Sequence, residues 1–302
     1  MTSPNISSVV DFSSIRSAFP YIKTFRNKRF VFKLGGELCE SKSTLNQIME
    51  QIALLSMFGI KVLIVHGGGK HATELGERLG YRSAFVSGRR VTSEEMIEVA
   101  KMSFAGVLNS DLVATMNALG IPAFGISGVD FDLVRAHRRP PVVIHDDRVN
   151  EEREVDFGFV ADIDSINKES LESILGLDAV PVVASLVSDK DGNILNINAD
   201  TLASELAIAM GASKLIQLTG VDGVMSDIND PMSLISVLTA AETDKLLTDP
   251  SISGGMIPKL KNAVHAIRGG VDQVHIISGT KQDAILQEIF TNEGSGTMIV
   301  SQ

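Results

Sequence analysis

The chain reads Lys61-Val62-Leu63-Ile64-Val65-His66-Gly67-Gly68-Gly69, a short apolar run that ends in three consecutive glycines. An uninterrupted apolar run of this length predicts a strand that is buried on both faces, as in parallel sheets. Glycines after such a strand allow a tight turn into a helix, and the amino end of a helix binds anions. Three glycines exceed what a turn needs, so the stretch indicates an anion-binding turn at the end of a buried strand.

Further apolar runs alternate with helical patterns along the chain. Runs typical of strands occupy residues 29–34, 121–126, 179–187, 213–219, 273–278 and 297–300. Helical patterns occupy residues 44–58, 92–118, 199–210 and 282–290. Thr92 with Glu95 predicts a capping box for the second helix, and residues 129–160 predict β-hairpins and exposed loops that act as a lid or an edge. The alternation predicts an α/β fold, a three-layer sandwich with a mainly parallel central sheet covered by helices on both faces.

The composition excludes several classes of protein. The 302 residues carry a net charge of −10, which argues against a nucleic-acid partner but permits local positive sites. The single cysteine, Cys39, excludes an internal disulfide, and there is no cysteine cluster to bind zinc. Residues 1–14 lack the pattern of a signal peptide, and no apolar run is long enough for a membrane span. We therefore expect a cytoplasmic protein without a metal site of its own.

Two lysines lie close to glycine pairs that are far apart in the sequence. Lys33 ends an apolar run just before Gly35-Gly36, and Lys259 follows Gly254-Gly255 in a stretch that is too rich in glycine for a plain helix start. Glycines let backbone N–H groups approach an oxyanion, and ammonium ions neutralise the charge of a phosphoryl group in transfer. Together they predict the transfer of a phosphoryl group between two anions.

The glycine turn is also compatible with a dinucleotide site. Gly67, Gly69 and Ala72 satisfy the pattern G-x-G-x-x-A. The pattern also expects a second strand that ends in an acidic residue about 20 positions later. Residues 86–90 show no convincing strand and no acid, although an arginine there suits a 2′-phosphate, so an NADP site stays open as an alternative. The P-loop pattern G-x-x-x-x-G-K-[ST] is absent.

Three polar residues have both a structural and a functional interpretation. Arg90 is either a solvated side chain or a bidentate clamp on a substrate carboxylate. Asp200 either complements the dipole of a helix or orients lysine ammonium groups, and Asn196 in the functional interpretation donates to a ligand. None of the six histidines has a sequence neighbour that suits nucleophilic catalysis.

Taken in order, these segments resemble the amino acid kinase family, and within it the acetylglutamate kinases. The resemblance covers residues 19–299 and is most specific at residues 33–36, 66–69, 88–92, 196–201, 254–259 and 294–298. It implies that the γ-phosphoryl group of ATP, with Mg²⁺ bound through the nucleotide, passes to the side-chain carboxylate of N-acetyl-L-glutamate in arginine biosynthesis. The alternatives are a kinase of a related acyl amino acid (acetylaminoadipate type) and a catalytically weak regulatory homologue. Retention of both lysines argues against the regulatory homologue.

The resemblance also implies a role for each matching residue. Lys33 and Lys259 would neutralise the transferring phosphoryl group, and Asp200 would hold both lysines in place. The residues implied in binding the acyl amino acid are Gly68, Gly69, Arg90 and Asn196. The residues implied in binding the nucleotide are Gly35, Gly36, Thr219, Asp222 and Gly223.

The resemblance further implies a division of the chain into parts. Residues 1–25 would form an N-terminal helix for oligomerisation, and residues 26–302 would form the kinase domain. Within this domain, residues 26–190 would bind the acyl amino acid and mediate dimerisation, and residues 191–302 would bind ATP.

The N-terminal helix presents an apolar face whose partner the sequence does not identify. Ile15, Phe19 and Ile22 lie on this face, with a kinking Pro20 among them, and the face packs either on its own subunit or on a neighbour. The resemblance favours the neighbour, which predicts a hexamer made of three dimers. It also implies an effector site for arginine, whose residues would be Tyr21, Glu288 and Gly294.

Several positions depart from the family's pattern. Gly220 stands where an aspartate usually lies beside the nucleotide, and Val129 stands where lysine is common. Residues 278–280 and Asp283 replace the usual Asp-Gly-Arg and histidine of the effector region. A carboxylate at residue 283 either attracts a cationic effector or spoils the geometry of its site, so the sequence leaves inhibition by arginine open.

Overall fold

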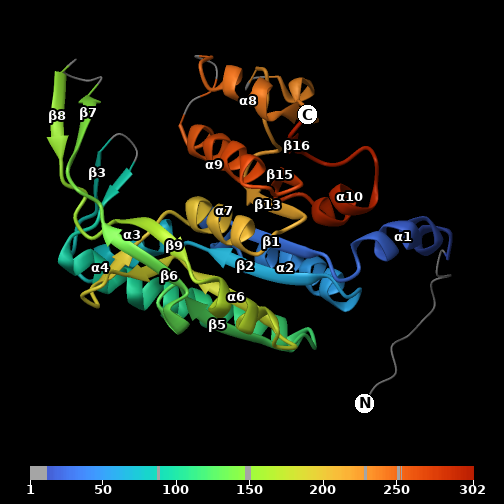
Figure 1. Ribbon diagram of the computed structural model, residues 1–302, viewed down its shortest axis with the longest axis horizontal. Helices are drawn as coiled ribbons and strands as arrows, with labels where there is room; N and C mark the ends of the chain where they lie inside the picture. The colour runs from blue at the N-terminus through green and yellow to red at the C-terminus, as the bar shows by residue number, and fades with distance from the viewer. Residues whose placement is uncertain (1–11, 87–88, 147–150, 228–229, 250–251, 253) are drawn as a thin grey trace.

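The computed structural model describes residues 12–86, 89–146, 151–227, 230–249, 252 and 254–302. The strands of its central sheet are β1 (Arg29–Leu34), β2 (Lys61–His66), β5 (Ala123–Ser127), β10 (Val180–Ala184), β13 (Lys214–Thr219), β14 (Val237–Thr239), β15 (Gln273–Ser278) and β16 (Thr297–Val300). Their order is β14-β16-β15-β13-β1-β2-β10-β5 (Figure 1). All neighbours are parallel except β15 and β16, which are antiparallel. The predicted mainly parallel sheet is confirmed.

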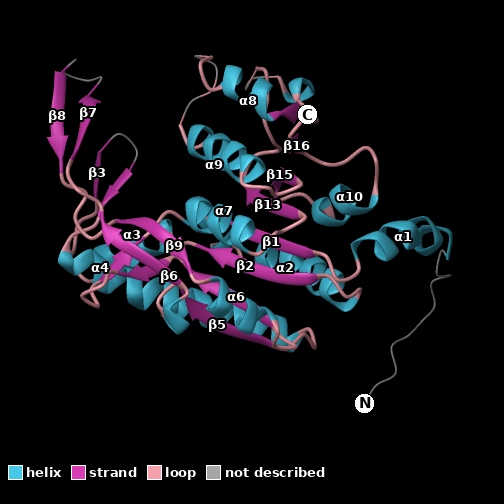
Figure 2. Ribbon diagram, in the orientation of Figure 1, coloured by secondary structure: helices cyan, strands magenta, loops and turns pink. Residues whose placement is uncertain are grey.

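Helices cover both faces of this sheet (Figure 2). One face carries α2 (Lys42–Met57), α5 (Asn109–Ala118) and α10 (Ala284–Phe290). The opposite face carries α6 (Lys168–Leu175), α7 (Ala199–Ala209), α8 (Ala240–Leu246) and α9 (Met256–Arg268). Side chains of β1 alternate between the two cores, so that Phe32 packs in one core and Val31 in the other. The predicted three-layer sandwich is therefore confirmed.

The long helix predicted over residues 92–118 is present, but it begins two residues later and contains a π-helical segment. It consists of α4 (Glu94–Ala100), a π-helix (Lys101–Leu108) and α5. Its cap is Ser93, whose hydroxyl accepts the N–H of Met96, and not Thr92 as predicted. The N–H of Thr92 instead donates to the carbonyl of Phe157, which holds Thr92 in an extended segment outside the helix.

The segment between the glycine turn and this helix contains strands that the sequence analysis did not predict. The turn leads into α3 (Gly69–Arg78), which is followed by β3 (Ala84–Val86) and β4 (Arg89–Val91). These two strands pair antiparallel as a hairpin, so the expectation of no strand at residues 86–90 is wrong. The hairpin is separate from the central sheet, however, and it therefore does not supply the parallel second strand of a dinucleotide fold.

The predicted hairpins of residues 129–160 are confirmed in part by a second sheet. Its strands are β6 (Val134–Arg138), β9 (Ala161–Ile166), β11 (Leu186–Ser188) and β12 (Ile194–Asn196), in the order β12-β11-β6-β9. Two further strands, β7 (Val142–Asp146) and β8 (Glu151–Val155), form a hairpin that projects from the body (Figure 1). Short 3₁₀ turns lie at Gly36–Cys39, Asp130–Asp132 and Pro231–Ser233.

The N-terminal helix α1 (Phe12–Phe25) packs partly on its own subunit. Tyr21 donates its hydroxyl to Asn292, and Phe25 stacks edge-on against Phe30 with the ring centroids 5.4 Å apart. Phe19 points away and is 64% exposed, so part of the predicted apolar face has no partner within the described subunit. The side chain of Ile15 lies outside the described part of the chain. Among the described helices, none combines the length and the apolar character that crossing a membrane requires.

Candidate active site

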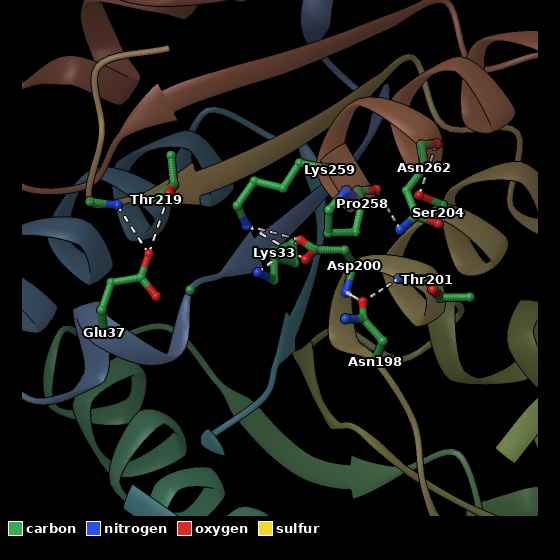
Figure 3. A network of polar contacts seen from close by, with 12 residues as sticks. Lys33, Glu37, Asn198, Asp200, Thr201, Ser204, Thr219, Pro258, Lys259 and Asn262 are labelled. Atoms are coloured by element: carbon green, nitrogen blue, oxygen red, sulfur yellow. Dashed lines mark hydrogen bonds and ion pairs between the residues drawn. The ribbon is translucent and has the colours of Figure 1, made fainter. Parts of the chain in front are cut away.

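Two lysines from opposite ends of the sequence meet one aspartate at the carboxyl edge of the sheet (Figure 3). Lys33 lies on β1, Asp200 in the first turn of α7 and Lys259 in the first turns of α9. The Nζ atom of Lys33 is 2.8 Å from Oδ1 of Asp200, and that of Lys259 is 3.5 Å from the same oxygen. The structure thus brings together the three residues that the sequence analysis named as catalytic.

The helix geometry around Asp200 explains how this aspartate is held. The side chain of Asn198 caps α7 by accepting the N–H groups of Asp200 and Thr201, at 2.8 and 3.1 Å. The cap leaves the carboxylate of Asp200 free to face the lysines. Asn262 then joins the two helices, because its side chain donates to Pro258 and its carbonyl accepts the hydroxyl of Ser204 (Figure 3).

The start of α9 differs from the sequence-based expectation. Residues 254–259 were expected to be too rich in glycine for a plain helix start, yet α9 begins at Met256, directly after Gly255. Gly254 has a φ of +58°, a left-handed conformation that suits glycine and that turns the chain into the helix. Lys259 is therefore on a rigid helix and not in a loop.

Burial and charge act against each other on these three groups. Burial opposes the charge on Lys33, but the carboxylate of Asp200 outweighs it and raises the pKa of Lys33. Burial likewise opposes the charge on Asp200, but the two lysines lower the pKa of its carboxyl group. For Lys259, burial and the charge of Lys33 lower the pKa together. The site therefore holds one carboxylate between two ammonium ions, and one of these holds its proton less tightly than the other.

Two glycine turns, the first at residues 35–36 and the second at residues 67–69, lie against each other beside the lysines. A Cβ atom on Gly36 would be 3.5 Å from the N atom of Gly69, and one on Gly68 would be 2.4 Å from a methyl carbon of Leu108. A side chain at residue 36 would contact the turn at residues 67–69, and one at residue 68 would clash with the π-helix. The glycines therefore keep the backbone of both turns accessible at the lysine cluster.

His66 contacts the backbone of the second glycine turn. Its Nδ1 atom lies 2.8 Å from the carbonyl of Gly67, and its Nε2 atom lies 3.1 Å from the side-chain nitrogen of Asn109. Burial lowers the pKa of His66 to about 4, so the ring is neutral near pH 7. With Nε2 accepting from Asn109, the proton is on Nδ1 and donates to Gly67. His66 positions the turn and is not placed to act as a base.

The residues predicted to bind the acyl amino acid surround two adjoining cavities. A cavity of about 200 Å³ is lined by Lys33, the glycine turns, Arg90, Asn196 and Asp200. A second cavity of about 730 Å³ shares Gly69, Arg90 and Asn196 with the first. The structure thus brings Gly68, Gly69, Arg90 and Asn196 together beside the lysine cluster.

Arg90 has partners within the protein in this conformation. Its guanidinium donates to the carbonyl of Gly69 and to the hydroxyl groups of Thr73 and Ser83, and the distance to Thr73 is 2.6 Å. It also lies 4.8 Å from the centre of the Phe85 ring. A ligand carboxylate that binds Arg90 would therefore replace or share these hydrogen bonds.

The residues predicted to bind the nucleotide lie in two groups. One is at the ends of β1 and β13, and the other is in the loop that follows β13. Gly35 and Thr219 lie at the ends of adjacent strands, and the N–H of Gly35 donates to the carbonyl of Leu218, so it is occupied within the fold. Asp222 forms an ion pair of 2.8 Å with Lys281. Gly223 packs so closely that a Cβ atom there would be 2.7 Å from Leu234. Gly36 alone of this set also lines the cavity of the lysines.

Glu37 is a site residue that the sequence analysis missed. Its Oε1 atom accepts the N–H of Gly220 at 3.1 Å and the hydroxyl of Thr219 at 3.3 Å (Figure 3). An acid is thus present in space beside Gly220, where the sequence analysis noted that one was missing. The signal was an acidic residue directly after Gly35-Gly36, but its contact with residue 220 is not visible in the sequence.

The three residues predicted for an effector lie together, away from the lysine cluster. Tyr21 bonds Asn292, and Gly294 packs against the carboxylate of Glu288. Glu288 is buried and already accepts from His275 at 2.6 Å and from the N–H of Ser295 at 2.6 Å. Burial opposes its charge, but the hydrogen bond and charge of His275, with backbone N–H groups, lower the pKa of Glu288 to about 2.

Acidic and histidine side chains form no metal-binding cluster in the described ranges. No group of three or more His, Cys, Asp or Glu side chains there is arranged to hold a metal ion. At the site, the carboxylate of Asp200 binds both lysines and that of Glu37 accepts the N–H of Gly220.

Comparison with known proteins gives matches over nearly the whole chain. A model of the amino acid kinase family matches residues 28–278. The acetylglutamate kinase of Myxococcus xanthus is 42% identical over 96% of this chain and 94% of its own. That of Methanocorpusculum labreanum is 43% identical over 96% of this chain and 97% of its own.

Solved structures with the same fold include a larger enzyme. An N-acetylglutamate synthase from Neisseria gonorrhoeae, complexed with coenzyme A and N-acetyl-glutamate, superposes with a TM-score of 0.83 at 26% identity over 97% of this chain. This chain spans 64% of that synthase chain. A carbamate kinase from Giardia lamblia bound to AMP-PNP shares the fold, with a TM-score of 0.65 at 17% identity, over 91% of this chain and 99% of its own.

Proposed function

Because the chain belongs to the amino acid kinase family, we propose that it transfers the γ-phosphoryl group of ATP to the side-chain carboxylate of N-acetyl-L-glutamate. The product is an acyl phosphate, and the reaction serves arginine biosynthesis in the cytoplasm. The observation that carries the proposal is the contact of Lys33 and Lys259 with Asp200 beside two glycine turns. The kinase names of the relatives support this reaction over the dinucleotide-binding alternative.

The arrangement suits a reaction whose obstacle is repulsion between anions. The attacking carboxylate is already a nucleophile near neutral pH and needs no general base, which agrees with the buried, neutral His66. What the reaction needs is neutralisation of the charge on the transferring phosphoryl group. Lys33 and Lys259 would supply the positive charge that neutralises it. Asp200 would fix the positions of both lysines, so that neither buried ammonium ion lacks a partner.

Substrate and nucleotide would bind on different sides of the lysine cluster. The guanidinium fork of Arg90 would donate two hydrogen bonds to the α-carboxylate of the acyl amino acid, with Asn196 as a further donor. The glycine turns would offer backbone N–H groups to the phosphoryl group. ATP would bind along the ends of β13 and β15, near Thr219, and its phosphates would carry Mg²⁺ into the site.

The division into lobes follows from this arrangement. Residues 26–190 contain β1, β2, β5 and β10 and would form the lobe for the acyl amino acid. Residues 191–302 contain β13 to β16 with α7 to α10 and would form the nucleotide lobe. Residues 1–25 would join dimers into a hexamer, which the exposure of Phe19 supports. The dimer itself would use the first lobe, where β5 is the edge strand of the central sheet.

Trapping of the acyl phosphate with hydroxylamine tests this function directly. The purified chain, with ATP and Mg²⁺, should yield a hydroxamate from N-acetyl-L-glutamate and little from other members of a panel of acyl amino acids. Turnover of an acetylaminoadipate-type substrate in its place would retain the family and reject the specific substrate. Binding of acyl amino acids without any turnover would identify a regulatory homologue.

A further inference from the structure

The carboxylate of Glu37 lies among hydrogen-bond donors at the ends of β1 and β13. It accepts from the backbone of Gly220 and from the hydroxyl of Thr219. It also lies over the first glycine turn, because a Cβ atom on Gly35 would be 2.7 Å from its Oε1 atom. The carboxylate also lies close to residue 220, since a Cβ atom there would be in van der Waals contact with Cγ of Glu37, at 3.5 Å.

The charges around Glu37 are those that would favour any anion at this place. Burial opposes its ionisation, but backbone N–H groups and then the charges of Lys33 and Lys259 lower the pKa of Glu37. Glu37 is therefore ionised near neutral pH. The residue as a whole is exposed, so its side chain can leave for solvent without opening the core. A carboxylate held in this way is a displaceable anion at a site built for anions.

We propose that Glu37 is a specificity-determining residue of the nucleotide site, whose carboxylate holds the place of an ATP phosphate until the nucleotide displaces it. The inference rests on the proposed use of ATP. Displacement breaks the two hydrogen bonds of Glu37 and brings its charge close to the incoming phosphates, so Glu37 weakens the binding of polyphosphates. The penalty is larger for metal-free ATP than for MgATP, because Mg²⁺ removes part of the negative charge of the nucleotide.

Binding of AMP-PNP, measured by calorimetry with and without Mg²⁺, tests the proposal in the variants Glu37→Gln and Glu37→Ala. We expect both variants to bind at least about fivefold more tightly than the wild type, with the larger gain in the absence of Mg²⁺. Inorganic triphosphate should show the same gain, whereas adenosine should bind equally to all forms. Glu50→Gln removes the same charge from an exposed position on α2 and should change none of these affinities.

The outcomes separate this inference from the proposed function. Weaker binding of Mg²⁺–AMP-PNP by Glu37→Gln would show that the carboxylate assists the nucleotide and would overturn the inference. Unchanged affinity in both variants would overturn it as well, while binding by the wild type would leave the proposed function intact. If neither the wild type nor the variants bound AMP-PNP, the proposed function would fail and the inference with it.

Discussion

Lys33 and Asp200 form an ion pair of 2.8 Å in which both residues are almost fully buried. Taking two charges out of water is costly, and replacing a buried pair by apolar residues is often neutral or stabilising. Stability alone therefore does not account for this pair. The pair lies in the wall of the cavity between the two glycine turns. This position indicates that the pair holds a charged side chain in place for catalysis.

Loss of either lysine should abolish most of the activity. In Lys33→Ala and Lys259→Ala we expect kcat to fall by about a hundredfold or more, because each ammonium acts on charge that develops in the transition state. Steady-state kinetics on N-acetyl-L-glutamate measures the effect. Lys61→Ala, at the exposed start of β2, is the matched control and should keep wild-type kcat. A fall of less than about threefold in either site variant would remove that lysine from the mechanism.

Arg90→Ala should act mainly on the acyl amino acid. Loss of a charged hydrogen-bond donor should raise the KM for this substrate by about tenfold to a hundredfold, with a smaller change in kcat. Arg135→Ala, which removes an exposed arginine paired with Asp132, serves as the control. An increase confined to the KM for ATP would mean that the two ligands bind in the reverse places.

The protein should lose stability in acid partly through His66. In the unfolded chain its imidazole takes up a proton near pH 6.5, but in the folded protein it does so only near pH 4. Between these values the unfolded state binds more protons, so the free energy of unfolding falls as the pH falls, by up to about 3 kcal/mol from this group. His66→Gln should flatten the decline measured by urea unfolding at several pH values.

A second histidine limits how far this variant can flatten the pH dependence. His275 is also buried with a lowered pKa, so some decline should persist in the His66 variant. A His66 variant with the full wild-type slope would contradict the assignment.

The protein should become more stable when the buried Gln217 is replaced by an apolar residue. Gln217 is fully buried on β13 beside Lys33, and neither polar atom of its side chain has a hydrogen-bond partner in the described structure. Since an unpaired buried amide is unfavourable, Gln217→Met should raise the free energy of unfolding by about 1–2 kcal/mol. Gln51→Met makes the same change where the side chain accepts the N–H of Ile285, and it should destabilise. Destabilisation by both changes would reveal a partner for Gln217.

The exposed side of α1 should control the assembly of dimers. Phe19→Glu places a charge on the exposed part of the helix and leaves the contacts of Tyr21 and Phe25 in place, so we expect a hexamer to dissociate into dimers that retain phosphoryl transfer. Light scattering measures the mass. Met232 lies outside α1 and is 90% exposed, and Met232→Glu should leave the hexamer unchanged. A hexamer that survives in Phe19→Glu would assign this face to its own subunit.

The sequence predicted best those strands of the central sheet that are buried on both faces, and it did not predict β14, whose first residue is exposed. β1, β2 and β15 begin and end where their apolar runs do, since no polar alternation blurs the limits. The π-helix from Lys101 to Leu108 was missed because its side chains give no period that separates it from an α-helix. The β3–β4 hairpin was missed because three-residue strands are too short to show a pattern.

The candidate site was predictable where it consists of residue types in order, and not where it depends on contacts. The sequence points to Lys33 and Lys259 because each lies close to a pair of glycines, and to Asp200 because it stands at the start of a predicted helix. Their meeting at 2.8 and 3.5 Å depends on the sheet order, which brings β13 beside β1. Glu37 depends on the same pairing, because its carboxylate reaches Gly220 only across the ends of these strands.

The pairing of β1 with β13 also has a consequence for the synthesis of the chain. β1 lies between β2 and β13, but residues 214–219 leave the ribosome long after residues 29–34. Until then, β1 has one unpaired edge whose backbone groups and apolar side chains are open to other chains. The nascent protein is therefore open to aggregation until β13 has been made, and chaperones that bind extended apolar segments should protect it until then.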